Sequence, residues 1–412
     1  MIAVCVAVLY RLSIIYPSIP VSVMTRSPLS EEQLLAVVAS NPNHAFAHQR
    51  LSELYVNSDA QLAEQHAVAS LLNNPANGMA MMTLMQLAEA KNPSVAYQAL
   101  QLGERLWPSH DYLHWHVANY WVRQDRLEKA MTAWDIVLQQ ESNKEFFSES
   151  WAARLIFPIF ERLAKNKTTR LLFDDYMISR PYWWGVFYKH LQSQRGNYQV
   201  VNYFYNKMGE YRPRTKDEVD EYLDYLAMEG RWHKANQLWR SQYIDYKVGV
   251  KGLINNGGFE SNSFNDLFSW NITEHQNVHT LLDSYSFVEG KHSLKISLTG
   301  WISTYWGHVW QLFVLPQGRY QLKFKARASI DSVRGFKWRI ACYGDAKKER
   351  LLAVSQEVND SKDWKAYTMI FNIPNTKACQ SQKLYLITAG SNKANQQVRG
   401  DVWFDAFSLR RL

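Results

Sequence analysis

The sequence predicts a multidomain α plus β protein, in which an N-terminal α-solenoid of helix hairpins precedes an antiparallel β-sandwich. Prolines recur 33 residues apart at Pro42, Pro75 and Pro108, which is typical of repeated helix pairs. From residue 253 onward the hydrophobic period changes to two, as in half-buried strands. A chain of 412 residues is also longer than a domain with one hydrophobic core usually is. We therefore expect an apolar segment over 1–24, a solenoid over 28–248 and a sandwich over 252–412.

The N-terminal segment is apolar except for Arg11 and includes Pro17 and Pro20. Its length approaches that of a membrane span, whereas the arginine and the prolines weaken a plain helix. Three interpretations stay open: an anchor, an unusual signal, or translated sequence upstream of a true start at Met24. We expect an anchor or export segment, with membrane contact only through residues 1–24, and a cytoplasmic protein if Met24 is the start.

The helical repeat is clearest in its third unit. Residues 112–123 form the predicted first helix, and Asp125 begins the turn to a second helix in which Ala130 occupies the close helix–helix contact. The period resembles that of tetratricopeptide units. This resemblance implies a concave surface that holds a protein partner.

Two side-chain groups in the helical part suggest sites. Tyr182, Trp183 and Trp184 begin an aromatic patch, but a helix starting at Pro181 would aim several of these rings into the core. His114 and His116 are two residues apart, so a helix points them in different directions and they cannot chelate one metal ion. We expect packing roles for both groups.

The strand-rich part predicts about eight to ten short strands. Residues 320–327, 336–340 and 367–373 alternate bulky or apolar residues with polar ones, as in antiparallel strands with one buried face. Residues 253–260 and 400–409 are expected to be the first and last strands of a closed sandwich.

Several landmarks follow one another along this part of the chain: Asn255, Gly258, Phe259, Glu260, Trp270, residues 289–296, 309–312 and 316–320, Trp364, and residues 403–405. With these landmarks in this order, the strand-rich part resembles jelly-roll carbohydrate-binding modules. The whole chain resembles tetratricopeptide proteins found beside bacterial exopolysaccharide machinery, which implies a location in the bacterial periplasm or anchored in the envelope.

The jelly-roll resemblance implies a structural Ca²⁺ ion, although the sequence demands no cofactor. Its carboxylate ligands would be Glu260 and Asp405, with backbone carbonyls near Glu289 and His292 completing a shell of hard oxygen ligands. The alternative is that both carboxylates hydrogen-bond strand ends.

Sugars bind by stacking their C–H faces on aromatic rings while polar side chains take the hydroxyl groups. Strand alternation does not say which face is inside, so Trp310 and Trp338 are equally candidates for the core, and a purely structural sandwich stays open. The expected glycan-binding residues are Tyr305, Trp306, Gln311, Trp338 and Arg339.

The three cysteines are too scattered for a metal site. Cys342 ends one predicted strand and Cys379 precedes another. They form either a disulfide between neighbouring strands, which implies an oxidising compartment, or two unrelated buried thiols.

The charge of +8 comes from 46 Lys and Arg against 38 Asp and Glu, without a basic run or a nucleic-acid-binding motif. We therefore expect no nucleic-acid partner. No nucleophile elbow, phosphate loop or dinucleotide fingerprint occurs either. Asp401 and Asp405 mimic a glycosidase pair, but they lie on one terminal strand without a cleft.

The sequence thus predicts a noncatalytic adaptor, with a solenoid that binds a protein and a sandwich that binds polysaccharide, in exopolysaccharide or envelope assembly. Two alternatives stay open: a protein-only scaffold whose sandwich has no sugar site, and an enzyme acting on polysaccharide.

Overall fold

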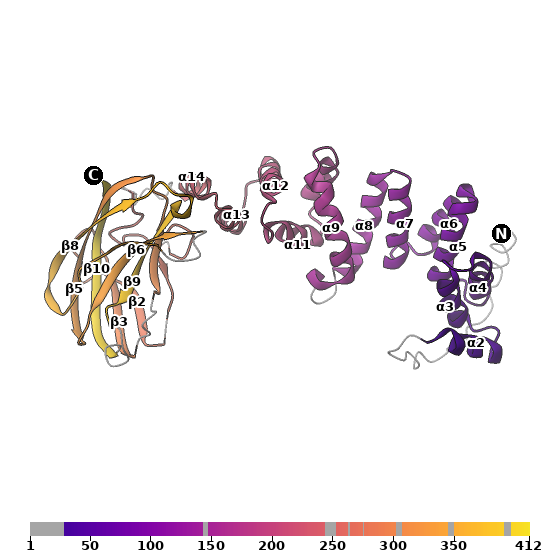
Figure 1. The fold of residues 1–412 in the computed structure, drawn as a ribbon, viewed down its shortest axis with the longest axis horizontal. Helices are drawn as coiled ribbons and strands as arrows, with labels where there is room; N and C mark the ends of the chain where they lie inside the picture. The colour runs from indigo at the N-terminus through magenta and orange to yellow at the C-terminus, as the bar shows by residue number, and fades with distance from the viewer. Residues whose placement is uncertain are drawn as a thin grey trace. The chain divides into compact units, whose positions relative to one another are not determined.

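The computed structural model describes residues 29–142, 147–243, 253–262, 264–274, 276–301, 307–344, 350–390 and 397–412. The apolar segment 1–24 lies outside the described residues, as do Tyr305 and Trp306. The chain forms two compact units, Met1–Leu191 and Gln192–Leu412 (Figure 1). Each unit is described by itself.

The first unit is helical. Its helices are α2 (Glu31–Ser40), α3 (Ala45–Tyr55), α4 (Ala60–Asn73), α5 (Gly78–Lys91), α6 (Pro93–Leu106), α7 (Asp111–Arg123), α8 (Leu127–Glu141), α9 (Trp151–Lys165), α10 (Asp174–Ser179) and α11 (Tyr182–Gln192), with 3-10 turns at Phe147–Glu149 and Thr169–Phe173.

The 33-residue spacing of the sequence reappears in how the helices begin. His44, Asn77 and His110 are the N-caps of α3, α5 and α7, and each side chain accepts the backbone N–H three residues later. Such caps satisfy donors that a helix start leaves unpaired. The close-contact residue Ala130 is fully buried, as the repeat requires.

The aromatic residues of α11 pack inward, as predicted. Trp183 and Phe187 are fully buried, and the Phe187 ring stacks on that of Phe173 with centroids 5.6 Å apart, whereas Tyr182 is exposed. His114 is also buried, and a ring nitrogen lies 2.9 Å from the carbonyl oxygen of Pro108. These groups contribute packing and local hydrogen bonds.

The second unit combines the last helices with the sandwich. The helices are α12 (Tyr198–Tyr211), α13 (Lys216–Met228) and α14 (Trp232–Tyr243). The strands are β1 (Asn271–Ile272), β2 (Val278–Asp283), β3 (Ser293–Trp301), β4 (Val309–Phe313), β5 (Gly318–Asp331), β6 (Phe336–Tyr343), β7 (Arg350–Val354), β8 (Ser361–Ile373), β9 (Ser381–Thr388) and β10 (Gln397–Arg411), with a 3-10 turn at Lys377–Cys379.

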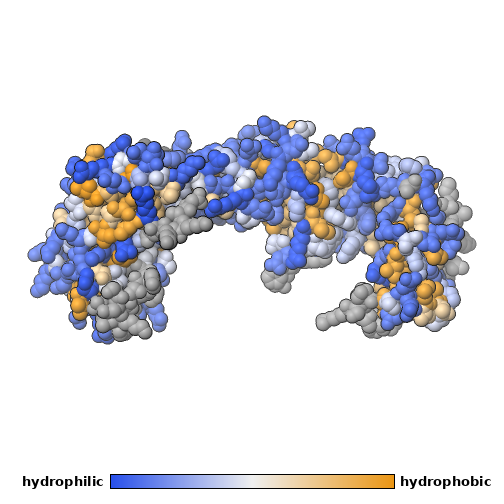
Figure 2. All heavy atoms as spheres, viewed as in Figure 1, coloured by the Kyte–Doolittle hydropathy of each residue, from blue (hydrophilic) through white to orange (hydrophobic). Residues whose placement is uncertain are grey.

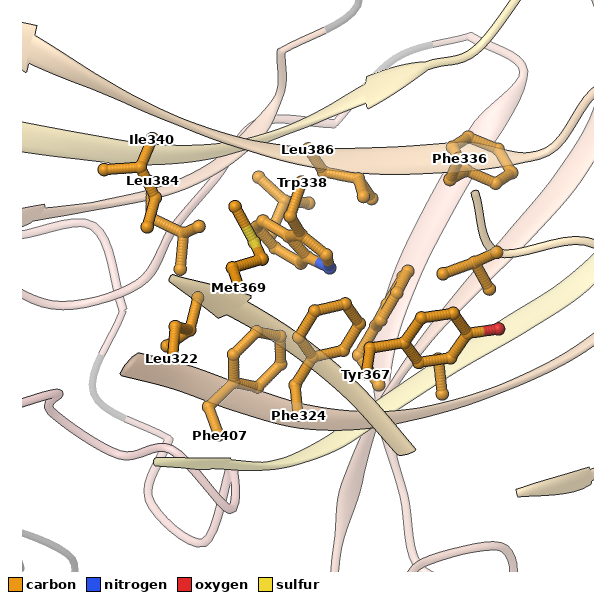
Figure 3. Packing of buried hydrophobic residues seen from close by; sticks show 14 of the residues in the cluster. Leu322, Phe324, Phe336, Trp338, Ile340, Tyr367, Met369, Leu384, Leu386 and Phe407 are labelled. Atoms are coloured by element: carbon orange, nitrogen blue, oxygen red, sulfur yellow. The ribbon is translucent and has the colours of Figure 1, made fainter. Parts of the chain in front are cut away.

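The strands form two five-stranded antiparallel sheets, ordered β1-β4-β9-β6-β7 and β2-β3-β10-β5-β8. Their inner faces make one apolar core, in which β5, β8 and β10 face β6 and β9 (Figure 3). The predicted class, helices followed by an antiparallel sandwich, is confirmed. Cys342 on β6 is joined to Cys379 by a disulfide, the first of the two alternatives for these cysteines.

The prediction that residues 253–260 form the first strand is wrong, because this segment pairs with no strand. Asn256 and Phe259 have left-handed φ angles of 48° and 56°, which interrupt an extended chain. The segment nevertheless lies against β10, since the N–H of Phe407 donates to the carbonyl of Gly257 at 2.8 Å.

The viewed surface is mainly hydrophilic over helices and sandwich alike, with hydrophobic residues in scattered patches (Figure 2). Within the described residues, no helix is both long enough and apolar enough to span a membrane.

Candidate functional site

The outer face of the sheet β1-β4-β9-β6-β7 carries a line of side chains suited to ligand contact. On β9, Leu384 and Leu386 are buried in the core, so alternation turns Tyr385 outward. The strand register places five residues directly opposite one another across the sheet. This outer row consists of Asn271, Trp310, Tyr385, Arg339 and Val354.

Positive charge accompanies the aromatic rings of this face. The ammonium group of Lys383 lies 4.5 Å from the ring centroid of Trp310 and 5.8 Å from that of Tyr385. Cations at such distances are attracted by the electron-rich ring faces. The outer row and the adjacent Lys383 therefore join flat apolar surface with groups that bind oxygen atoms.

Helix α14 borders one end of the same face. The Trp232 ring meets that of Tyr343 edge to face, with centroids 5.7 Å apart, and the indole of Trp239 donates to Asp266 at 2.9 Å. Leu312 and Trp239 line the same small cavity, and Leu312 is only 3% exposed. It is buried although strand alternation places it on the same face as Trp310. The accessible part of the face therefore begins at the outer row.

Two of the predicted glycan-binding residues are corrected by the structure. Gln311 is fully buried, and its side-chain amide bonds both the N–H and the carbonyl of Asn255, at 3.2 and 2.9 Å. Trp338 is also fully buried and packs edge to face against Phe404. Both point between the sheets, so neither reaches a ligand on the surface.

Arg339 is the predicted residue that the structure places on the outer face. Trp310, which the sequence left undecided between core and surface, lies in the outer row. Tyr385 was missed, although the alternation of Leu384 and Leu386 around it was the signal that would have found it.

Glu260 and Asp405 come together at one loop, where they accept backbone N–H groups. Asp405 is fully buried and accepts from Val288 at 2.6 Å, and Glu260 accepts from Lys291 at 2.8 Å. Burial raises the pKa of Asp405, against the lowering effect of these N–H donors.

Two carboxylates supply at most four of the six to eight oxygen ligands of a calcium shell. The N–H groups of the 288–292 loop point at the carboxylates of Glu260 and Asp405. In the described ranges, no three His, Cys, Asp or Glu side chains gather around one point. The geometry matches the alternative, in which the carboxylates hydrogen-bond strand ends.

Asp401 and Asp405 do not face each other across a cleft. The Asp401 carboxylate lies 3.0 Å from the Lys295 ammonium and accepts the Ser297 hydroxyl at 2.6 Å, while Asp405 is enclosed in the sandwich. Both carboxylates are held in structural contacts.

Comparison with known proteins assigns a family model to the sandwich: residues 251–392 match a family described as a carbohydrate binding domain. No curated protein matches the chain.

Among similar solved structures is a putative sugar binding protein from Bacteroides thetaiotaomicron, at 13% identity and a TM-score of 0.30, covering 39% of this chain and 100% of that one. Another is a xylan-binding domain from Paenibacillus barcinonensis, at 17% identity and a TM-score of 0.28, covering 38% and 91%. A third was solved with β-1,4-galactotriose, at 19% identity and a TM-score of 0.27, covering 40% and 100%.

Proposed function

We propose that the protein is a noncatalytic adaptor whose sandwich binds a polysaccharide across the outer row. The observation that carries this proposal is the alignment of Trp310, Tyr385 and Arg339 on one open sheet face, within a region that matches a carbohydrate binding domain. Sugar rings stack their C–H faces on such rings, while guanidinium and amide groups bond the hydroxyls.

The second half of the proposal concerns the helices. Repeated helix pairs form extended surfaces that suit a protein partner. Tyr112 on α7 is 47% exposed and stacks on Trp151, with ring centroids 5.0 Å apart, which supplies an accessible aromatic surface. Joining a protein site to a glycan site gives an avid contact from two modest affinities. This role suits polysaccharide assembly in a bacterial envelope.

The test is affinity electrophoresis of the full chain through native gels that contain neutral or acidic polysaccharides. Tyr385→Ala should weaken retention about tenfold, because a lost stacking contact is worth roughly 1.4 kcal/mol. Tyr285→Ala is the matched control, since Tyr285 is 97% exposed and lies outside the outer row.

Equal loss in both variants would show that the outer row is not the site. If no polysaccharide retains the wild-type chain, the sandwich has no sugar site and the protein-only scaffold replaces this proposal.

A further inference from the structure

We infer that the polysaccharide bound at the outer row is anionic, with carboxylate groups on its sugar residues. This inference rests on the proposed function and deepens it by naming the ligand class. Its first support is charge. Beside the outer row, the strand register aligns Leu312, Lys383, Ala341 and Leu351. The two lines contain no acidic residue, and the outer row holds the cation Arg339.

The second support is the lack of a partner for the Arg339 side chain among the described residues. Its Nε atom is covered from solvent and has no hydrogen-bond partner among the described residues. Because the Nε atom is covered, a ligand on the surface can meet this guanidinium only through its terminal Nη nitrogens. The planar guanidinium presents a fork of donors that matches a carboxylate.

A neighbouring cation on the same strand is paired with a carboxylate, unlike Arg339. Lys337, two residues earlier on β6, has its ammonium 3.6 Å from the Glu357 carboxylate, which also pairs with Arg334 at 2.7 Å. In the described part of the chain, no carboxylate forms an ion pair with Arg339. Of these two cations of β6, Lys337 is paired with a carboxylate, and Arg339 is not paired with one among the described residues.

The third support is spacing. Tyr385 lies directly opposite both Trp310 and Arg339 on the neighbouring strands. Neighbouring strands are about 4.8 Å apart, which is about the width of a sugar ring. A sugar stacked on Tyr385 thus extends its substituents over the next strand, where Arg339 meets them. A carboxylate there accepts two N–H bonds, whereas a neutral hydroxymethyl group accepts fewer and carries no charge.

The experiment is calorimetric titration of the full chain with polygalacturonate and with its methyl ester, which has the same backbone without the charges. We expect polygalacturonate to bind about 10- to 100-fold more tightly, as charge-assisted hydrogen bonds to one guanidinium provide. Arg339→Gln should abolish this preference, and Arg339→Lys should retain only part of it. Thermal melts of each variant confirm that the fold is kept.

The matched control is Lys323→Gln, which removes the same charge from an exposed position on the other sheet. Equal affinity for the two polymers, or a preference that survives in Arg339→Gln, would overturn the inference. A preference lost equally in Lys323→Gln would also overturn it, because general charge attraction would then suffice. Dextran sulfate and dextran form a second pair of charged and neutral polymers. If dextran sulfate binds tightly and polygalacturonate does not bind, carboxylated polysaccharides are excluded as the ligand class. Failure of every polymer, charged or neutral, would instead refute the proposed function itself.

Discussion

Replacing Trp338 by alanine should destabilise the sandwich strongly without touching the outer row. The Trp338 side chain is fully buried, with its ring centroid 5.2 Å from that of Phe407 and 5.6 Å from that of Trp270. Its indole N–H has no hydrogen-bond partner in the described residues, so packing alone sets the magnitude. Removing a buried tryptophan costs about 3–5 kcal/mol. For a unit of this size, that lowers the unfolding midpoint by roughly 6–20 °C.

The assay is differential scanning calorimetry of the full chain, with Trp310→Ala as the matched control. Trp310 belongs to the outer row and is only partly buried, so its loss should shift the midpoint by less than about 3 °C. Equal shifts in the two variants, or a loss below about 1 kcal/mol for Trp338→Ala, would refute the assignment of inner and outer faces.

Three further predictions concern stability. Reducing the Cys342–Cys379 disulfide, which links residues 37 apart in sequence, should cost about 3–4 kcal/mol, and an unchanged urea midpoint would contradict this. Gly290→Ala should lower the melting temperature, because φ at Gly290 is +72° and a Cβ atom would lie 2.2 Å from a Glu260 carboxylate oxygen. Adding CaCl₂ or EDTA should leave the melting temperature of the wild-type chain unchanged, and a rise with CaCl₂ would show a bound ion. Burial raises the pKa of Asp283, but N–H donors lower it more, so the pKa in the folded state lies below 3.8. The charged carboxylate therefore stabilises the fold above pH 3.8, and this stabilisation is lost as the pH falls through the folded pKa. Asp283→Asn should abolish this pH dependence in melts at acid pH.

The parts of the fold that sequence could predict are those set by local chemistry. A proline or an N-cap every 33 residues fixes where a helix pair begins, so the repeat was visible before any packing was known. Strict alternation in residues 336–340 likewise located β6.

The errors arise where tertiary contacts override the local pattern. On β4, both Gln311 and Leu312 are buried, one by its bonds to Asn255 and the other beside Trp239 of α14. Because these two consecutive residues are both buried, β4 lacks the regular alternation of buried and exposed residues that would have assigned Gln311 to the core and Trp310 to the surface. The left-handed φ angles of Asn256 and Phe259 interrupt the expected strand. The Asn-Gly and Gly-Gly pairs of residues 256–258 are turn signals that the strand prediction overlooked.

The most direct test of polysaccharide binding at the outer row is hydroxyl-radical footprinting of the full chain, with and without a polysaccharide that retains it in affinity electrophoresis. We predict that the ligand protects the Trp310 and Tyr385 side chains from oxidation and leaves Tyr285 unchanged. Protection confined to Tyr285 or to the sheet β2-β3-β10-β5-β8, with Trp310 and Tyr385 oxidised as before, would show that the polysaccharide does not bind at the outer row.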